Sequence, residues 1–271
     1  MKRFLLITLL SLPTLAHAAS FKVISLAPHA TELAYAAGLG DALIAVDDYS
    51  DYPPEVDKLE HVASYRGINL ERVVALKPDL VIAWKGGNPD KEVAKLEKLG
   101  IKVFYSNPKS LDETAQQIDA LSKFAADPAK GSAVAEQVRS ELAEIRAEQK
   151  GKTAVPYFYQ LASDPLMTNG GNNWPAPLFK MCGGENVFKD AKAAYPMINK
   201  EQVIVNKPEA IFYSDNTDPK AFWESWKSHL PAAQSDSVFS LNPDWLNRAT
   251  PRALKAVRQI CTALDKVRAT A

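Results

Sequence analysis

The sequence predicts an α/β protein of two similar lobes that are joined by a single long rigid helix, with a ligand cleft between the lobes. Three observations support this prediction. The stretch NLERVVALKPDLVIAW at residues 69–84 recurs without a gap as NKEQVIVNKPEAIFYS at residues 199–214. Strand and helix patterns alternate on both sides of one long central helical segment, as they do where helices cover a mostly parallel sheet. The 271 residues, 46% of them hydrophobic, suffice for two packed cores.

Each copy of the repeat reads as a helix that leads into a buried strand. The side chain of Asn69 or Asn199 can accept a backbone N–H at the start of the helix. Glu71 or Glu201 follows in the first turn, where the helix dipole favours negative charge. Lys-Pro then ends the helix, because proline disfavours helical geometry in the residue before it. The two copies therefore mark corresponding positions in the two lobes.

Residues 1–18 have the pattern of a secretory signal peptide. Two basic residues precede an apolar run at residues 4–15, and Ala16-His17-Ala18 is a small-x-small cleavage signal. The run is too short for a good membrane span, and no cysteine near the cleavage point offers a lipid anchor. We therefore expect a periplasmic protein, monomeric when free, whose signal peptide is cleaved near Ala18.

Residues 19–126 are expected to form the first α/β lobe. Its strands are predicted at 21–26, 42–46, 80–84 and 101–105, and its helices at 28–37, 69–77, 89–99 and 110–126. The last helix opens with a capping box, in which Glu113 lies three residues after Ser110. The polar, aromatic segment 47–65 reads as a loop.

Residues 127–150 are predicted to form one linker helix that spans both lobes. Asp127 can cap it, Pro128 suits its first position, and Gly151 ends it. Its apolar positions form one stripe, Ala135, Val138, Leu142 and Ile145. About twenty helical residues span roughly 30 Å, the width of a small domain. Because the helix has no interior proline, we expect the lobes to move little relative to each other.

Residues 151–271 are expected to form the second α/β lobe. Its strands are predicted at 155–161, 210–214 and 238–241, and its helices at 175–182, 199–207, 221–228 and the C-terminus. Residues 167–174, 191–198 and 242–248 read as loops. Cys182 and Cys261 both lie in this lobe. In an exported protein an even pair is more often bridged than free, and this bridge would contribute ~4 kcal/mol on the chain-entropy model.

The loops that face the expected cleft are unusually aromatic. They carry Tyr49, Tyr52, Tyr65 and Trp84 in the first lobe, and Trp174, Tyr195 and Trp245 in the second. Aromatic side chains on both sides suit a large ligand with flat or apolar faces. The alternative is that these rings close the ends of the sheets, and Trp84 and Tyr52 fit that role best.

Other functional classes have little support in the sequence. The formal net charge of zero gives no attraction to nucleic acid or an anionic membrane. The histidines of the mature chain, His29, His61 and His229, are scattered without metal-ligand spacing. There is no GxSxG elbow, P-loop or dinucleotide-binding motif. We therefore expect neither an enzyme nor a resident metal or cofactor.

Several motifs resemble the periplasmic cobalamin-binding proteins of vitamin importers, over essentially the whole mature chain. They are YSDYPP at 49–54, GINLERVVALKPDLVIAWKGGN at 67–88, CGGENVFKD at 182–190, KEQV at 200–203 and DWLNR-x-x-PR at 244–252. The resemblance implies a solute-binding protein that carries cobalamin (vitamin B12) as its transported ligand. It also implies an ABC-type inner-membrane importer of two membrane subunits and two ATPase subunits as the partner.

The resemblance also implies roles for particular residues. Contact with the corrinoid is implied for Tyr49, Asp244, Trp245, Leu246, Asn247 and Arg248, and the flat rings at Tyr65, Trp84, Trp174 and Tyr195 complete the expected site. Glu71 and Glu201 would dock on arginines of the permease, and Cys182 and Cys261 would form the family's disulfide. The chain departs from the family in having Tyr65 and Tyr195 where tryptophans are usual, and Asn247 where a Glu is usual. Related haem-binding proteins use Tyr or His as an axial ligand, so the alternative is the same fold binding haem or a ferric siderophore.

Overall fold

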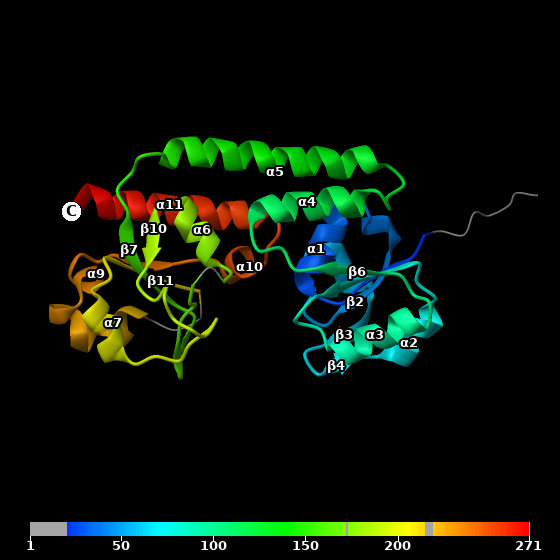
Figure 1. The fold of residues 1–271 in the computed structure, drawn as a ribbon, viewed down its shortest axis with the longest axis horizontal. Coiled ribbons are helices and arrows are strands. Elements are labelled where there is room, and N and C mark those ends of the chain that lie inside the picture. The colour runs from blue at the N-terminus through cyan, green and yellow to red at the C-terminus, as the bar shows by residue number, and fades with distance from the viewer. Residues whose placement is uncertain (1–20, 172, 215–218, 271) are drawn as a thin grey trace, which may run out of the picture.

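The structure is a computed structural model that describes residues 21–171, 173–214 and 219–270. The predicted signal peptide and its cleavage point near Ala18 lie outside these residues. The described part forms two α/β lobes beneath a long helix (Figure 1). No helix in it is both long and apolar enough to cross a membrane.

The first lobe is built on a six-stranded sheet with the order β4-β3-β2-β1-β5-β6. All neighbours are parallel except β3 and β4. The strands are β1 Val23–Ser25, β2 Leu43–Asp47, β3 Glu60–Ser64, β4 Gly67–Ile68, β5 Leu80–Trp84 and β6 Val103–Ser106. The helices are α1 Pro28–Ala36, α2 Leu70–Leu76, α3 Asp90–Lys98 and α4 Leu111–Ser122, with short 3-10 turns η1 Gly40–Ala42 and η2 Pro54–Lys58.

Side chains of the central strand β5 alternate between two hydrophobic cores. Leu80 and Ile82 pack with α1 and α4 on one face, while Val81 and Ala83 pack with α2 and α3 on the other. The prediction that 47–65 is a loop is wrong over β3. This strand escaped notice because it is short and only its centre is buried, so its polar ends resemble a loop.

The long helix α5, Pro128–Gln149, is continuous, as its apolar stripe predicts. The Asp127 side chain accepts the Ala129 N–H at 3.1 Å, and all four residues of the stripe are buried. The helix packs along α4 of the first lobe and contacts α6 and α11 of the second. Gly131 is needed at one crossing, since a Cβ there would lie 2.5 Å from the Ser122 Cβ.

The second lobe is built on a four-stranded parallel sheet with the order β10-β7-β11-β12. The strands are β7 Val155–Gln160, β10 Gly184–Asn186, β11 Ala210–Tyr213 and β12 Val238–Ser240, beside a small hairpin of β8 Ala162–Ser163 and β9 Leu166–Met167. The helices are α6 Ala176–Met181, α7 Lys200–Asn206, α8 Pro219–Trp223, η3 Glu224–His229, α9 Pro231–Gln234, α10 Pro243–Leu246 and α11 Ala253–Thr270.

Two predictions for this lobe need correction, and one strand of its sheet was not predicted. The loop predicted at 242–248 contains α10, which forms because the Asn242 side chain accepts the N–H groups of Asp244 and Trp245. Strand β10 was missed because it has only three residues, two of them polar. The helix predicted at 221–228 is the end of α8 followed by η3.

The repeat forms equivalent structures in the two lobes. Asn69 caps α2 and Asn199 caps α7, the latter in a full capping box with Gln202. Both helices end on a lysine with positive φ, 52° at Lys77 and 45° at Lys207. The capping box predicted at Ser110 is only half formed. The Ser110 hydroxyl accepts the Glu113 N–H, but the Glu113 carboxylate accepts the N–H of Lys109 instead of that of Ser110.

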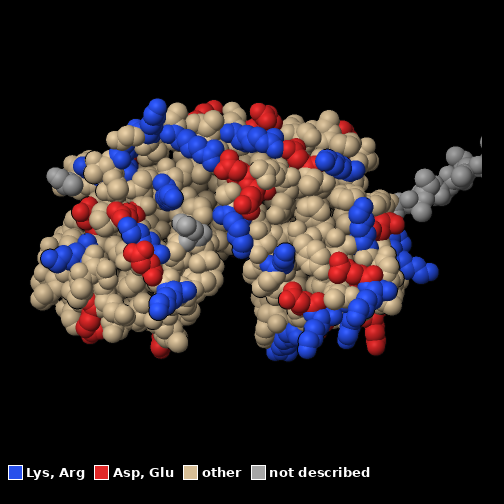
Figure 2. Space-filling view, in the orientation of Figure 1, with Lys and Arg blue, Asp and Glu red and all other residues tan. Residues whose placement is uncertain are grey.

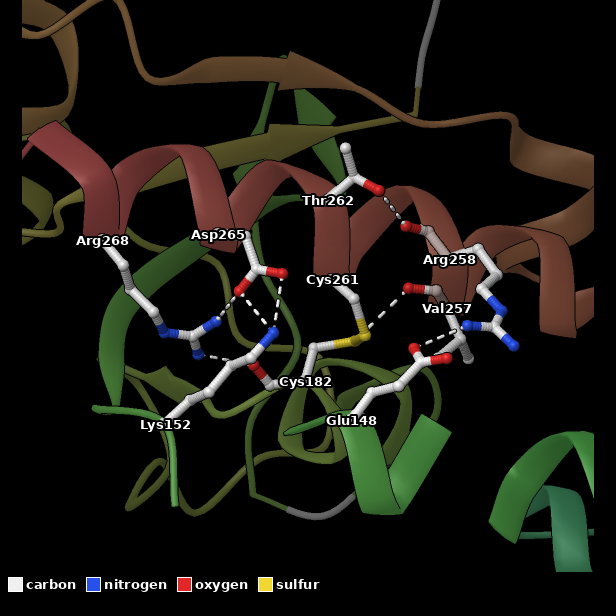
Figure 3. Close-up of a disulfide and its surroundings, with 9 residues drawn as sticks. All are labelled: Glu148, Lys152, Cys182, Val257, Arg258, Cys261, Thr262, Asp265 and Arg268. Carbon is white, nitrogen blue, oxygen red and sulfur yellow. Dashed lines mark hydrogen bonds and ion pairs between the residues drawn. A yellow bond between two sulfur atoms is a disulfide. The ribbon is translucent and has the colours of Figure 1, made fainter. Parts of the chain in front are cut away.

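The predicted disulfide between Cys182 and Cys261 is present and joins the end of α6 to α11 (Figure 3). Arg268 reinforces this junction by donating to the Cys182 carbonyl at 2.7 Å and to Asp265 at 2.7 Å. Asp265 also accepts from Lys152, which precedes β7. The C-terminal helix is thereby held against the rest of its lobe.

Candidate ligand-binding site

A cleft of about 900 Å³ separates the two lobes. It opens on the side away from α5, where Figure 2 shows a deep hollow between them. Its first-lobe wall consists of segments that follow β1, β5 and β6, and Leu161 of its second-lobe wall follows β7. The carboxyl ends of parallel strands therefore frame the cleft, as in other α/β ligand sites. The predicted residues that line it are Trp84, Trp174, Tyr195, Asn247 and Arg248.

On the first-lobe wall, Trp84 is fixed by its neighbours while the residue stays 43% exposed. Its N–H donates to the Asn88 side chain at 2.6 Å, and Asn88 in turn donates to the Leu26 carbonyl at 2.9 Å. A Cβ at Gly87 would lie 2.0 Å from the indole, so this position requires glycine. The His29 and Trp84 rings are nearly perpendicular to each other, with their centroids 5.5 Å apart.

On the second-lobe wall, two aromatic rings are tied together by hydrogen bonds. The Trp174 indole donates to the Leu246 carbonyl at 2.7 Å, and the Tyr195 hydroxyl donates to the Trp174 carbonyl at 3.2 Å. Burial raises the pKa of Tyr195. Asn247 lies beside these rings, with its side chain 3.3 Å from the Tyr159 hydroxyl. The wall is therefore aromatic and already organised without a ligand.

The other predicted contact residues do not line the cleft. Leu246 is fully buried in the core, so only its carbonyl takes part in the site. Trp245 packs against the same core, with the Lys255 ammonium 5.1 Å from its ring centroid. Asp244 is paired with Arg248. Both residues lie on the short helix α10, where the Leu246 side chain is part of the core and the Trp245 side chain packs against that core.

Tyr49 and Tyr65 form an exposed pair on the first lobe. Their ring centroids are 6.3 Å apart, and they are 54% and 74% exposed. Neither lines the cleft. The Arg66 guanidinium donates to the Tyr65 hydroxyl at 3.0 Å. Contact between these two rings and a ligand therefore stays a prediction.

Arg248 joins the two lobes at the base of the cleft. It donates to Asp51 at 2.5 and 3.2 Å and to Glu32 at 3.1 Å, and both acids belong to the first lobe. Arg252 donates to the same Glu32 at 2.9 and 2.5 Å and lies 4.0 Å from the Tyr52 ring centroid. We call Glu32, Asp51, Arg248 and Arg252 the interlobe clamp. Hydrogen bonding to Arg248 lowers the pKa of Asp51.

Sequence reasoning missed Glu32, Asp51 and Arg252, the residues that form the clamp with Arg248. The available signal was Glu32 itself, an acid within the apolar helix segment PHATELAYA. A carboxylate that is only 3% exposed requires a cationic partner. The sequence could not identify that partner, which lies more than two hundred positions away.

A buried polar network supports the loop that carries Tyr49 and Asp51. Ser50 donates to Asp47 at 2.5 Å and lies 2.6 Å from the Thr31 hydroxyl. Asp47 also accepts the Tyr49 N–H at 3.1 Å. Burial raises the pKa of Asp47, although these hydrogen bonds oppose the shift. The network ties this loop to α1, which presents Glu32 to the clamp.

His29, which is not among the predicted site residues, lies in the cleft wall at the start of α1. Burial lowers its pKa to about 4, and the charge of Arg248 adds to this effect. Its Nε2 atom is buried and has no hydrogen-bond partner in the described part of the chain. Among the residues described, no three His, Cys, Asp or Glu side chains are grouped as a metal site.

Comparison with known proteins identifies the family. A family model described as periplasmic binding protein matches residues 23–245, most of the chain and all of the cleft lining except residues 247–249. The chain belongs to the periplasmic binding protein family. A vitamin B12-binding protein of Vibrio parahaemolyticus is 48% identical over 256 residues, which cover 94% of this chain and 93% of the relative. One of Yersinia pseudotuberculosis is 42% identical over 271 residues, with 98% and 94% coverage.

Solved structures agree with the family assignment. The periplasmic vitamin B12-binding protein BtuF of Vibrio cholerae superposes with a TM-score of 0.87 at 47% identity, covering 91% of this chain and 97% of that one. The haem-binding protein RhuT from Roseiflexus has a TM-score of 0.78 at 23% identity, covering 92% and 100%. The second likeness shows the fold alone. This periplasmic binding protein thus has the predicted two-lobe fold.

Proposed function

We propose that this periplasmic binding protein captures cobalamin in the cleft and delivers it to an ABC-type importer in the inner membrane. The observation that carries the proposal is that aromatic side chains line both walls of the cleft, which has a volume of about 900 Å³. Trp84 lies on the first-lobe wall, and Trp174 and Tyr195 lie on the second-lobe wall. A corrin ring is large and flat, and aromatic side chains contact such faces with a large area at low entropic cost. The extensive identity to proteins named vitamin B12-binding supports the same ligand.

Calorimetric titration of the mature protein with cyanocobalamin tests this proposal. We expect one ligand per chain, and an absence of binding heat and of spectral change at every concentration would overturn it. Haem in the same titration tests the alternative. An axial tyrosine binds iron as the phenolate, and burial raises the pKa of Tyr195, which disfavours that form. We therefore expect Tyr195 to give no tyrosinate-ligated haem spectrum, and such a spectrum would favour the haem alternative.

The ligand contacts within this proposal follow the residues that line the cleft. Trp84, Trp174 and Tyr195 supply flat surfaces, and Asn247 supplies a polar contact. Tyr49 and Tyr65 extend the aromatic surface beyond the cleft and are assigned to the exposed edge of the ligand. Arg248 acts through the interlobe clamp, in which Glu32 and Asp51 neutralise its charge. Cobalamin is then a transported ligand, and we assign neither a resident cofactor nor an enzymatic activity.

Docking on the importer is assigned to Glu71 and Glu201. Each lies in the first turn of its helix, α2 or α7, and each is exposed. Exposed valines follow them on the same helices, Val74 and Val205. A Glu in the first turn also offsets the helix dipole, by ~0.3–1 kcal/mol. Recurrence at one position in both lobes favours a two-point contact with arginines of a pair of membrane subunits, served by two ATPase subunits.

Residence in the periplasm completes the proposal. We assign residues 1–18 to a signal peptide that is cleaved near Ala18, after which the protein diffuses as a monomer. N-terminal sequencing of the exported protein tests the cleavage point, and light scattering of the free protein tests the monomeric state. An N-terminus far from Ala19 would contradict the first assignment, and a dimeric mass would contradict the second.

A further inference from the structure

The charged side chains that line the cleft are all basic, namely Lys85, Lys109 and Arg248. The whole chain has 32 basic and 32 acidic residues, so this bias does not follow from composition. Arg248 is neutralised by Glu32 and Asp51 of the interlobe clamp. The uncompensated positive charge of the cleft therefore belongs to the two lysines on the first-lobe wall.

Asn107 holds these two lysines next to each other. Lys85 follows β5, and Lys109 follows the neighbouring parallel strand β6. The Asn107 side chain donates to the Lys85 carbonyl at 2.8 Å and accepts from the Lys109 ammonium at 2.9 Å. The Lys85 N–H donates to the Ser106 carbonyl at 3.0 Å. The backbone of Lys85 and the ammonium of Lys109 are thereby held beside Asn107, past the carboxyl ends of β5 and β6.

Neither lysine has an acidic partner within residues 21–171, 173–214 and 219–270. Every ion pair in that part of the chain involves other side chains. Glu113 lies close in the chain, but its carboxylate accepts the backbone N–H of Lys109 at 2.8 Å. Unpaired positive charges in the wall of a cleft raise the local concentration of anions.

Building on the proposed function, we propose that Lys85 and Lys109 bind the phosphodiester that links the nucleotide base of cobalamin to its corrin ring. The phosphodiester is an anionic group, whereas the peripheral amides of the ligand are neutral. Lysine suits this role because a phosphate attracts its compact charge without demanding a fixed geometry. The aromatic walls contact the flat faces that all corrinoids share. The lysine pair then selects complete cobalamins over corrinoids that lack the nucleotide.

The test compares cyanocobalamin with dicyanocobinamide, which lacks the phosphodiester and the base. Both are titrated into the wild-type protein, into Lys85→Met/Lys109→Met, and into the matched control Lys91→Met/Lys98→Met. The control lysines lie on α3, outside the cleft lining. We expect the cleft variant to bind cyanocobalamin about tenfold more weakly, the effect of losing charge-assisted contacts. Its affinity for dicyanocobinamide should stay within about twofold of wild type, and the control should match wild type for both ligands.

Salt dependence gives an independent readout. Raising ionic strength should weaken wild-type binding of cyanocobalamin and have little effect on the cleft variant, because screening acts on exposed charges. Equal losses for both ligands, or no loss for either, would overturn the phosphodiester assignment while leaving cobalamin binding intact. If the folded wild-type protein bound neither ligand, the proposed function itself would fail. Thermal unfolding of each variant confirms that it is folded.

Discussion

Replacing Glu32 with Gln should destabilise the protein strongly, because this carboxylate neutralises two guanidinium groups. Glu32 is 3% exposed, and Arg248 and Arg252 are each 15% exposed. Breaking a buried pair by removing one partner costs about 3–5 kcal/mol. Arg248 keeps Asp51 as a partner, so the lower end, about 3 kcal/mol, applies here. A protein of this size loses about 2–4 °C per kcal/mol, which predicts a Tm lower by about 6–12 °C.

Differential scanning calorimetry of the mature protein measures this change. The matched control is Glu136→Gln, which removes an exposed partner of Arg139 and should change stability by less than about 0.5 kcal/mol. A double-mutant cycle with Arg252→Met should give a coupling energy above about 1 kcal/mol. A Tm within about 1 °C of wild type for Glu32→Gln, or additive effects in the cycle, would refute the assignment of a cooperative clamp.

Four further predictions concern the cleft, acid stability, lobe motion and docking. Trp84→Ala should weaken cyanocobalamin binding by ~1–3 kcal/mol in a titration, whereas Tyr105→Ala, outside the cleft, should not; equal effects would remove Trp84 from the site. The pKa of His29 is about 4 in the folded state, against an ordinary 6.5. Between these pH values the unfolded state binds a proton that the folded state does not. The free energy of unfolding is therefore full above pH 6.5 and falls by up to about 3 kcal/mol as the pH approaches 4. In His29→Leu, the free energy of unfolding should therefore decrease less steeply as the pH is lowered than it does in wild type. Unfolding curves at several pH values measure this, and an unchanged pH dependence would contradict this origin. Small-angle scattering should show nearly equal radii of gyration with and without cobalamin, since α5 has no interior defect; a large decrease would show that the lobes close. Glu71→Arg/Glu201→Arg should bind cobalamin normally but fail to support uptake, and normal uptake would leave both residues as helix-end acids.

The sequence predicted the fold well wherever its signals were local. The caps at Asn69 and Asn199 and the apolar stripe of α5 each depend on residues within a few turns, so pattern alone located them. Strand β3 and helix α10 were missed because both are short. Strand β3 forms because it pairs with β2, and α10 forms because the Asn242 side chain caps it.

The site was harder to predict, because its residues meet only in three dimensions. Trp84, Trp174 and Tyr195 were expected in the cleft and do line it. Leu246 was assigned with its neighbours in one motif, yet it is the buried residue of α10, which separates its role from that of Asn247 and Arg248 in the cleft wall. Arg248 reads from sequence as a ligand contact. The structure shows that the Arg248 guanidinium is already paired with Glu32 of the other lobe.

The positive φ angles of Lys77 and Lys207 have an energetic consequence for both lobes. A residue with a side chain is less stable than glycine in this conformation, by roughly 1–2 kcal/mol. Glycine is the usual residue at the end of a helix, yet each lobe has a lysine there, directly before the proline that leads into its central strand. Each lobe therefore carries the same local backbone strain between a capped helix and the strand that follows it.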